Sequence, residues 1–204
     1  MSAAETWSSQ IKISPTAMID QGVNVGEGAA IWDLSRVREG AVVGAHTVVG
    51  RNVYVDRDVM IGANCKIQNN ALLYWPATIG DGVFIGPGAI LTNDRHPRAI
   101  NADGTLKGLD DWFPAGVTVD SGAAIGAGVV IVGGVHVGAW ALVGAGSVVT
   151  RDVPSHALVT GNPAVQVAWV GRGGRRLVET EDVFVDSESG DRYRLVDDEL
   201  VEER

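Results

Sequence analysis

Aliphatic residues recur at every sixth position along two stretches of this chain, from Ile13 to Leu91 and, in a new frame, from Val119 to Val149. Neither an α-helix, which repeats near 3.6 residues, nor a flat strand, which repeats at two, can use a period of six. Each hexad is therefore expected to be one short strand followed by a corner, and three hexads close one triangular turn. The pattern predicts an all-β protein built as a parallel β-helix.

The fourth residue after each aliphatic is small or β-branched, as a corner pressed against the turn below requires. These corner residues are Ala17, Val23, Ala29, Ser35, Ala41, Thr47, Val53, Val59, Cys65 and Ala71. Many of the 27 glycines directly follow an aliphatic position, where neighbouring turns approach closely. At a strand spacing of about 4.8 Å per layer, the predicted prism is roughly 30 Å tall.

Residues 92–116 interrupt the repeat and are rich in Pro, Asn, Asp and Gly, which predicts a long loop. A loop of this length inside a compact domain is usually functional. We expect residues 1–12 to be a lead-in that covers the open end of the first turn, and residues 13–154 to be the β-helix domain. Residues 155–204 form an extension that ends in a predicted hairpin, with arms at 177–185 and 192–201.

The formal charge of −9 is concentrated at one end of the chain, since residues 179–204 hold eleven acidic residues against three arginines. The rest of the chain is nearly neutral, which disfavours nucleic-acid binding through a basic field. No apolar run is long enough to cross a membrane and no charged-then-apolar leader is visible, so we expect a cytoplasmic protein without a membrane partner. The single cysteine, Cys65, lies at an inward corner and is expected to pack there.

Large polar side chains break the repeat at a few outward positions. Trp32, Arg38, Gln68 and Tyr74 occupy places where small residues are usual, and Asp56 shares a column with Arg38 and Tyr74. Gln68, Asn69 and Asn70 form three consecutive amides, which offer both donors and acceptors to a ligand. The alternative is that stacked asparagines only cap a turn.

Among four histidines, His96 is the candidate for chemistry, because it lies in the ejected loop beside Asp94 and Arg98. A histidine has an ordinary pKa near 6.5 and can take a proton at neutral pH. The alternative is an ordinary loop histidine. His46, His136 and His156 lie at positions expected to be on the surface.

The hexads, the His-Pro pair in the loop and the closing VGAGSVVTRDVPSHALVTGNPA together resemble the hexapeptide-repeat acyltransferases. Members of that family move an acyl group from coenzyme A or acyl carrier protein, and the resemblance covers residues 13 to about 170. The stretches KIQNN, FIGPGAILTNDRHPR, GNPA with Trp169 and Val170, and SGDRYRLVDDEL are similar to one branch. That branch N-acetylates the 3-amino group of UDP- or dTDP-linked deoxysugars, and the resemblance also implies a left-handed winding.

The resemblance further implies a homotrimer with an active site in each cleft between neighbours, and acetyl-CoA as co-substrate without a metal. His96 and Asn70 are the implied catalytic residues. The implied substrate contacts are Gln68, Asn69, Tyr74, Asp94 and Arg98. The positions implied to lie along coenzyme A are Gly126, Gly144, Ala145, Asn162 and Pro163.

The loop departs from the nucleotide-sugar members in one respect. Those members read Asn-Pro-Arg where this chain has His96-Pro97-Arg98, which is similar to the Thr-X-His-Pro of sugar and antibiotic acetyltransferases that use the histidine as base. A sugar amine with a pKa near 8 is partly neutral at pH 7, and the departing thiolate could accept its proton. A hydroxyl acceptor would need His96 as base.

We therefore predict an acetyl-CoA-dependent N-acetyltransferase that acts on a nucleotide-linked amino sugar in polysaccharide or glycoside biosynthesis. The alternative is an O-acetyltransferase on a sugar, an antibiotic or a small hydroxy acceptor. A γ-type carbonic anhydrase is disfavoured because the histidines are too scattered to hold zinc. A non-catalytic hexapeptide scaffold is the remaining reading.

Overall fold

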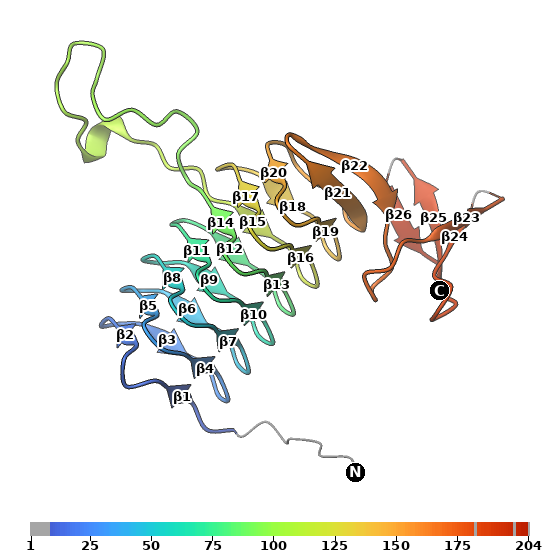
Figure 1. The fold of residues 1–204 in the computed structure, drawn as a ribbon, viewed down its shortest axis with the longest axis horizontal. Helices are drawn as coiled ribbons and strands as arrows, with labels where there is room; N and C mark the ends of the chain where they lie inside the picture. Colours follow the sequence, from blue (N-terminus) through green and yellow to red (C-terminus); the bar gives the residue numbers. More distant parts are fainter. Residues whose placement is uncertain (1–8, 182, 198, 204) are drawn as a thin grey trace.

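The computed structural model describes residues 9–181, 183–197 and 199–203. In it, twenty strands of two residues each coil into a prism of triangular cross-section (Figure 1). Successive strands belong to three different sheets, and each strand pairs in parallel with the strand one turn above it, one turn below it, or both. Ile67, for example, is in register with Val49 and with Ile85. The parallel β-helix predicted from the six-residue repeat is therefore confirmed.

The three sheets are named A, B and C in the order in which the chain visits them. Sheet A consists of β1 (Lys12–Ile13), β4 (Ala30–Ile31), β7 (Val48–Val49), β10 (Lys66–Ile67), β13 (Phe84–Ile85), β16 (Ala124–Ile125), β19 (Leu142–Val143), β21 (Ala157–Gly161) and β22 (Ala164–Trp169). Sheet B consists of β2 (Met18–Ile19), β5 (Arg36–Val37), β8 (Tyr54–Val55), β11 (Leu72–Leu73), β14 (Ile90–Leu91), β17 (Val130–Ile131) and β20 (Val148–Val149). Sheet C consists of β3 (Asn24–Val25), β6 (Val42–Val43), β9 (Met60–Ile61), β12 (Thr78–Ile79), β15 (Thr118–Val119) and β18 (His136–Val137).

The core is a column of aliphatic side chains inside the prism. The second residue of each strand from β4 to β20 is buried, and so are the small corner residues from Ala29 onward. Two buried corner hydroxyls are satisfied by carbonyls of the adjoining corner, since Ser35 donates to Gly50 O at 2.6 Å and Thr47 donates to Gly62 O at 2.7 Å. A buried hydroxyl without a partner would cost free energy, so these bonds make polar corners compatible with the core.

Close approach between turns explains why glycine follows so many strands. A Cβ built on Gly44 would lie 2.3 Å from the carbonyl carbon of Gly62 in the next turn. The second corner residue often adopts a left-handed backbone, as Asn52 and Asn70 do with φ of 55° and 62°. Asparagine tolerates this region better than most side chains.

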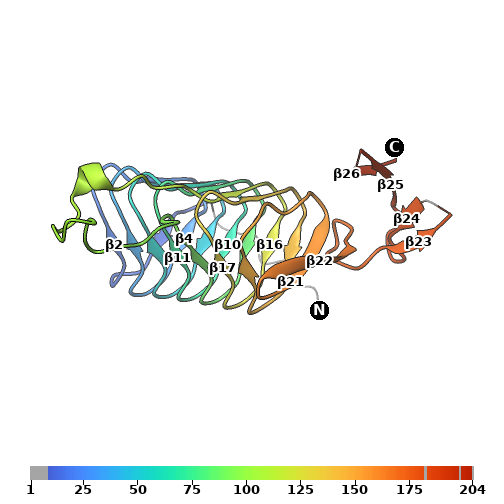
Figure 2. The same ribbon diagram turned by 90° about the horizontal axis from the view of Figure 1, so that it is seen from above.

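The segment 92–116 forms a long loop that leaves the prism between β14 and β15, as predicted. It projects far from the prism in Figure 1, and in Figure 2 it is seen at the end of the molecule where β2 lies. It contains one short 3-10 helix, η1 (Leu109–Asp111). The helical repeat is undisturbed by the excursion, because Ile79 in β12 pairs with Val119 in β15 as if no residues intervened. We call residues 92–116 the excursion loop.

The chain ends in an antiparallel sheet beyond the prism, which we call the C-terminal sheet. Strands β21 and β22 form a hairpin on the last turn of sheet A, and β23 (Val178–Thr180), β24 (Val183–Val185), β25 (Arg192–Val196) and β26 (Glu199–Glu202) form the C-terminal sheet. The predicted hairpin is present as the β24–β25 pair. Each predicted arm is divided at a residue with positive φ, Glu181 or Asp197, so four strands replace two.

The first turn of the prism is partly open among the described residues, since Ile13 is 45% exposed. Residues 1–8 of the predicted lead-in lie outside the described residues. Among the described residues, no helix is long and apolar enough to cross a membrane.

Candidate active site

The three consecutive amides form the corner from β10 to β11, on the edge of the prism between sheets A and B, which we call the A–B edge. Asn69 accepts the backbone N–H of Arg51 through Oδ1 at 2.9 Å, and Asn70 accepts a hydrogen bond from the Asn52 amide at 2.9 Å. Both asparagines therefore cap the turn below. Among the described residues no acceptor meets their own Nδ2 groups, so those donors remain open to a ligand on the exposed side. Gln68 lies beside them and is half-buried.

Gly126, Gly144 and Ala145 lie higher on the same A–B edge, directly after β16 and β19. A Cβ on Gly126 would come within 2.5 Å of the Ala145 nitrogen, so a side chain there would displace the turn above. Ala127 and Ala145 are exposed residues, and within the described part of the chain their backbone N–H groups meet no acceptor. These amides can donate to a bound molecule that lies along the edge.

Asn162 and Pro163 form the tip of the β21–β22 hairpin. The hairpin is anchored near the upper end of the A–B edge, because Gly161 N–H donates to Ser147 Oγ at 3.1 Å. Pro163 also lines a cavity of about 310 Å³ against the last turns of the prism. All five positions implied to lie along coenzyme A are thus found toward one end of the molecule.

Tyr74 lies on a different edge, between sheets B and C, which we call the B–C edge. Its ring is 5.6 Å from that of Tyr54 in the turn below. Asp56, which is 9% exposed, accepts hydrogen bonds from Arg38 at 3.0 Å and from Tyr54 at 3.1 Å. The hydrogen bond to Tyr54 raises the pKa of Arg38, and burial raises the pKa of the Tyr54 phenol. This network keeps Arg38 charged and Tyr54 protonated at neutral pH.

The excursion loop leaves from the same B–C edge and carries His96 on its outgoing arm. His96 is exposed, and its backbone N–H donates to Asp94 Oδ1 at 2.8 Å. The carboxylate therefore stabilises the turn before the histidine and does not bond its imidazole ring. Arg98 is also exposed, and its guanidinium donates to Pro97 O at 2.8 Å.

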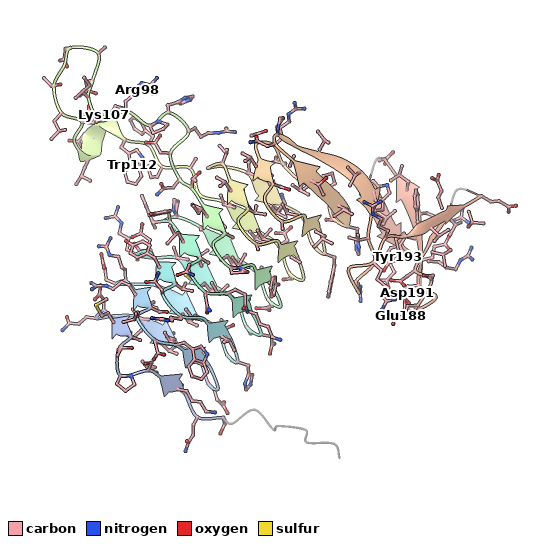
Figure 3. All side chains as sticks on the ribbon, in the orientation of Figure 1. Arg98, Lys107, Trp112, Glu188, Asp191 and Tyr193 are labelled. Carbon is pink, nitrogen blue, oxygen red and sulfur yellow. The ribbon has the colours of Figure 1, made fainter. Side chains whose placement is uncertain are left out.

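A cavity of about 450 Å³ opens between the two arms of the excursion loop. Its lining includes Arg98, Lys107 and Trp112, which Figure 3 shows on the loop, away from the strands of the prism. Asp94 completes the polar lining, and Gly108 and Leu109 supply the remainder. Two cations, one carboxylate and one indole can together contact a polar ligand that carries phosphate groups.

The predicted residues thus fall into two groups on two edges of the prism. Gln68, Asn69 and Asn70 share the A–B edge with the positions implied for coenzyme A, whereas Tyr74 and His96 belong to the B–C edge. Sheet B lies between these edges, so one chain does not bring the two groups together.

The other histidines lie elsewhere. His136 in β18 contacts Asp120 through Nε2 at 2.8 Å on the exposed face of sheet C, as expected of a surface residue. His156 is buried, contrary to the surface position expected from its sequence context, because the C-terminal sheet covers it. The part of the chain that the structure describes contains no group of three or more His, Cys, Asp or Glu that could hold a metal ion.

Four residues near the excursion loop were not singled out as site residues from the sequence. Asn93, Trp75 and Trp112 line the base of the loop, and Asp56 lies beneath them. Arg38, Asp56 and Tyr74 are eighteen residues apart, which is one triangular turn, so the sequence predicts that they stack on one another. The spacing alone gives no reason to connect these three residues to the loop. Trp112 could not be placed, because the six-residue pattern ends before it.

Family models for two kinds of hexapeptide repeat match this chain. The model described as bacterial transferase hexapeptide (six repeats) matches residues 40–74 and 58–93, and the model described as hexapeptide repeat of succinyl-transferase matches residues 116–151. The two sets of matches lie on either side of the excursion loop. The first set covers the later part of the first frame of the aliphatic repeat, from residue 40 onward, and the second set covers the second frame.

The chain is similar to acetyltransferases of several kinds. It is 42% identical over 83 residues to the dTDP-3-amino-3,6-dideoxy-alpha-D-galactopyranose 3-N-acetyltransferase of Aneurinibacillus thermoaerophilus. The aligned region covers 39% of this chain and 41% of that protein. The chain is 40% identical over 93 residues to serine acetyltransferase 4 of Arabidopsis thaliana, which covers 45% of this chain and 25% of that protein. The chain therefore spans less than half the length of these curated relatives.

The fold of this chain is also similar to that of a solved structure. A hexapeptide-repeat acetyltransferase from Vibrio cholerae, complexed with acetyl coenzyme A, matches with a TM-score of 0.55 and 29% sequence identity. The match covers 65% of this chain and 72% of that chain.

Proposed function

We propose that this chain is a member of the hexapeptide-repeat family with its left-handed β-helix fold, and that it is an acetyl-CoA-dependent N-acetyltransferase. The proposed acceptor is the amino group of a UDP- or dTDP-linked 3-amino deoxysugar. The observation that carries the proposal is the pairing of two features on one scaffold. Exposed amides without acceptors follow the A–B edge, and a loop with an exposed His-Pro pair and a polar cavity leaves the B–C edge.

The relatives support both the proposed acceptor and the proposed acetyl donor. The Aneurinibacillus relative acts on a dTDP-linked 3-amino sugar, and the Vibrio neighbour is complexed with acetyl coenzyme A. By analogy, the backbone N–H groups of Ala127 and Ala145 would donate hydrogen bonds to the pantetheine arm of acetyl-CoA. Asn162 and Pro163 would contact acetyl-CoA near the hairpin. A cytoplasmic setting is part of the proposal, and the free thiol of Cys65 fits a reducing compartment.

The assembly belongs to the same proposal. We infer a homotrimer in which the A–B edge of one copy faces the B–C edge of the next, because each edge alone carries only half of the candidate residues. Gln68, Asn69 and Asn70 would then contact the acceptor from one side. The second copy would contribute Tyr74 and the excursion loop.

The reaction can be written with these residues alone. The neutral amine attacks the thioester carbonyl and forms a C–N bond, the C–S bond breaks, and coenzyme A leaves as the thiolate. The amine proton goes to His96 or to the departing thiolate, so no oxidant or metal is needed. Backbone N–H groups at the A–B edge would stabilise the oxyanion of the tetrahedral intermediate.

The direct test is a thiol-release assay with acetyl-CoA and a panel of amino-sugar nucleotides. We expect turnover with UDP- or dTDP-linked 3-amino sugars, and formation of an amide that mass spectrometry detects as a gain of one acetyl group. The matched control is the 3-hydroxy sugar nucleotide. Absence of turnover with every 3-amino sugar nucleotide would contradict the proposal.

An O-acetyltransferase is the second candidate, because His96-Pro97 provides an exposed histidine in the loop and the chain is similar to serine acetyltransferases. A hydroxyl acceptor requires a base to remove its proton during attack. Turnover of serine, a sugar hydroxyl or an antibiotic hydroxyl in the same assay, without turnover of the amino sugars, would favour this candidate.

A further inference from the structure

The excursion loop rests on one corner of the prism, formed by Trp75 and Pro76 between β11 and β12. On the outgoing arm, the Asn93 side-chain amide donates to Trp75 O at 2.5 Å. On the returning arm, Gly116 lies so close that a Cβ there would be 2.3 Å from Pro76 O, and the ring centroid of Trp112 is 6.2 Å from that of Trp75. Both arms of the loop therefore depend on the position of this corner.

The corner is in turn held from the turn below. The backbone N–H of Trp75 donates to Asp56 Oδ2 at 3.2 Å. The guanidinium of Arg57 lies 4.6 Å from the centre of the Trp75 ring, in cation–π geometry. Asp56 and its chain neighbour thus fix both the backbone and the side chain of Trp75.

Every group that meets the Asp56 carboxylate is a donor. Oδ1 accepts from Arg38 at 3.0 Å, from the Tyr54 hydroxyl at 3.1 Å and from the Arg57 backbone at 2.9 Å, while Oδ2 accepts from Trp75. An asparagine at this position would have to direct its NH₂ group toward one of these donors. The arrangement therefore requires a carboxylate, not only a side chain of that shape.

We propose that Asp56 is a positioning residue for the active site, which acts through Trp75 to set the conformation of the excursion loop and hence the place of His96. The catalytic part of this inference rests on the proposed acetyltransferase function, whereas the effect on the loop does not. Asp56 itself contacts no residue of the loop in the hydrogen bonds described. Its influence on the loop passes through the Trp75–Pro76 corner.

A matched control exists in the same column. Asp20 stands two turns below Asp56, at the same place after its strand, and pairs with Arg36 at 2.8 Å. Among the described residues, the hydrogen bonds and the ion pair of Asp20 do not involve the Trp75 corner or the loop. The substitution Asp20→Asn therefore removes a comparable arginine–carboxylate pair without reaching the loop.

The first experiment measures the loop directly, by limited tryptic digestion of the folded protein. The loop contains cleavable bonds after Arg95, Arg98 and Lys107. Because cleavage tracks the population of the opened loop, we expect Asp56→Asn to raise the rate of cleavage at these bonds by about tenfold or more. Asp20→Asn should be cleaved there at the wild-type rate. Equal loop cleavage in the two variants would overturn the proposal.

The second experiment separates positioning from general destabilisation. We expect Asp56→Asn to lower kcat about 10- to 100-fold, as misplacement of a catalytic group does, and to leave the KM for acetyl-CoA unchanged. The reason is that the amides proposed to bind the donor lie on the other edge. Asp20→Asn should leave both constants unchanged. Normal kcat in an Asp56→Asn enzyme with an opened loop would also overturn the proposal.

If Asp56→Asn does not fold, Gly116→Ala tests the same contact from the loop side. Its added Cβ would push against Pro76 O without altering Asp56. We expect the same faster loop cleavage and the same loss confined to kcat, and an unchanged loop and kcat would count against the inference. A wild-type protein without acetyltransferase activity would contradict the proposed function alone, since the cleavage experiment needs no substrate.

Discussion

Asn70 serves the fold and is also a candidate for binding the acceptor. Its backbone has φ of 62°, and its side-chain oxygen accepts a hydrogen bond from Asn52 in the turn below. The first feature explains why asparagine is suitable at this corner without any reference to function. The sequence could therefore mark Asn70 as unusual, but it could not separate capping from binding.

Substitution by glycine tests the Asn70 amide without straining the backbone. Asn70→Gly keeps the left-handed backbone without strain and removes only the amide, so we expect kcat/KM to fall roughly 10- to 150-fold if the amide binds the acceptor. Asn70→Ala should in addition destabilise the fold by about 1 kcal/mol, because its Cβ is unfavourable at positive φ. The measurements are steady-state kinetics and thermal melts.

The matched control is Asn52→Gly. Asn52 also has positive φ, at 55°, and lies one turn lower on the same edge. This variant should keep wild-type turnover. Wild-type turnover in Asn70→Gly as well would identify both residues as caps only.

His96 is the second residue whose role can be tested by itself. If its imidazole removes the acceptor proton, His96→Ala should lower kcat by about 10²- to 10⁴-fold and abolish the acidic limb of the pH–rate profile. Asp94 should matter less, since its oxygen accepts the backbone N–H of His96 and an asparagine oxygen can do the same. We therefore expect Asp94→Asn to retain activity within about threefold. A near-normal kcat in His96→Ala, with an unaltered pH profile, would assign the proton to the departing thiolate.

At the scale of elements, the prism was predictable because one physical demand repeats at every turn. An inward aliphatic and a small corner are needed in each hexad, so strands β4 to β20 follow directly from the spacing. The excursion loop was found by the same rule, as the place where the pattern fails. What the spacing could not predict is the contact of the loop with the Trp75–Pro76 corner, since Asn93 and Gly116 carry no periodic signal.

The C-terminal sheet shows a second limit of pattern reading. Alternation identified the two arms of a hairpin, but the sharp turns at Glu181 and Asp197 depend on positive φ at acidic residues, which is uncommon. The packing of this sheet on the prism was also not predictable. His156 is buried at that junction, with its ring centroid 5.2 Å from that of Tyr193 and its Nδ1 3.0 Å from Val170 O.

This junction predicts a pH dependence of stability. Burial lowers the pKa of His156, so the unfolded chain binds a proton more readily than the folded one. Above the pKa of His156 in the unfolded chain, near 6.5, the histidine should not reduce the free energy of unfolding. The free energy of unfolding should fall as the pH drops below 6.5 toward the lower pKa that His156 has in the folded protein. We expect the amide protons of β25 to exchange faster relative to those of the prism at pH 5 than at pH 7. His156→Asn, which tolerates the positive φ of 62° at this position, should remove that difference.

At the scale of the whole molecule, the division of the candidate residues between two edges is the main consequence of the fold. A β-helix stacks its corners into straight edges, so residues one turn apart are neighbours while residues on different edges stay apart. Asn70 and His96 fall on different edges for this reason. If both act on one substrate, they must come from different copies of the chain.

This arrangement predicts a gain of activity when two impaired variants are mixed. In a trimer each site would combine Asn70 from one copy with His96 from the next, so a site between a His96→Ala copy and an Asn70→Gly copy can be intact. Random exchange at equal amounts should make about one site in four intact, and activity should rise to roughly a quarter of the wild-type value. The assay is thiol release after the variants are unfolded together and refolded, with separately refolded variants as the control. If the refolded mixture forms trimers but is no more active than the separate variants, Asn70 and His96 do not meet across a subunit boundary.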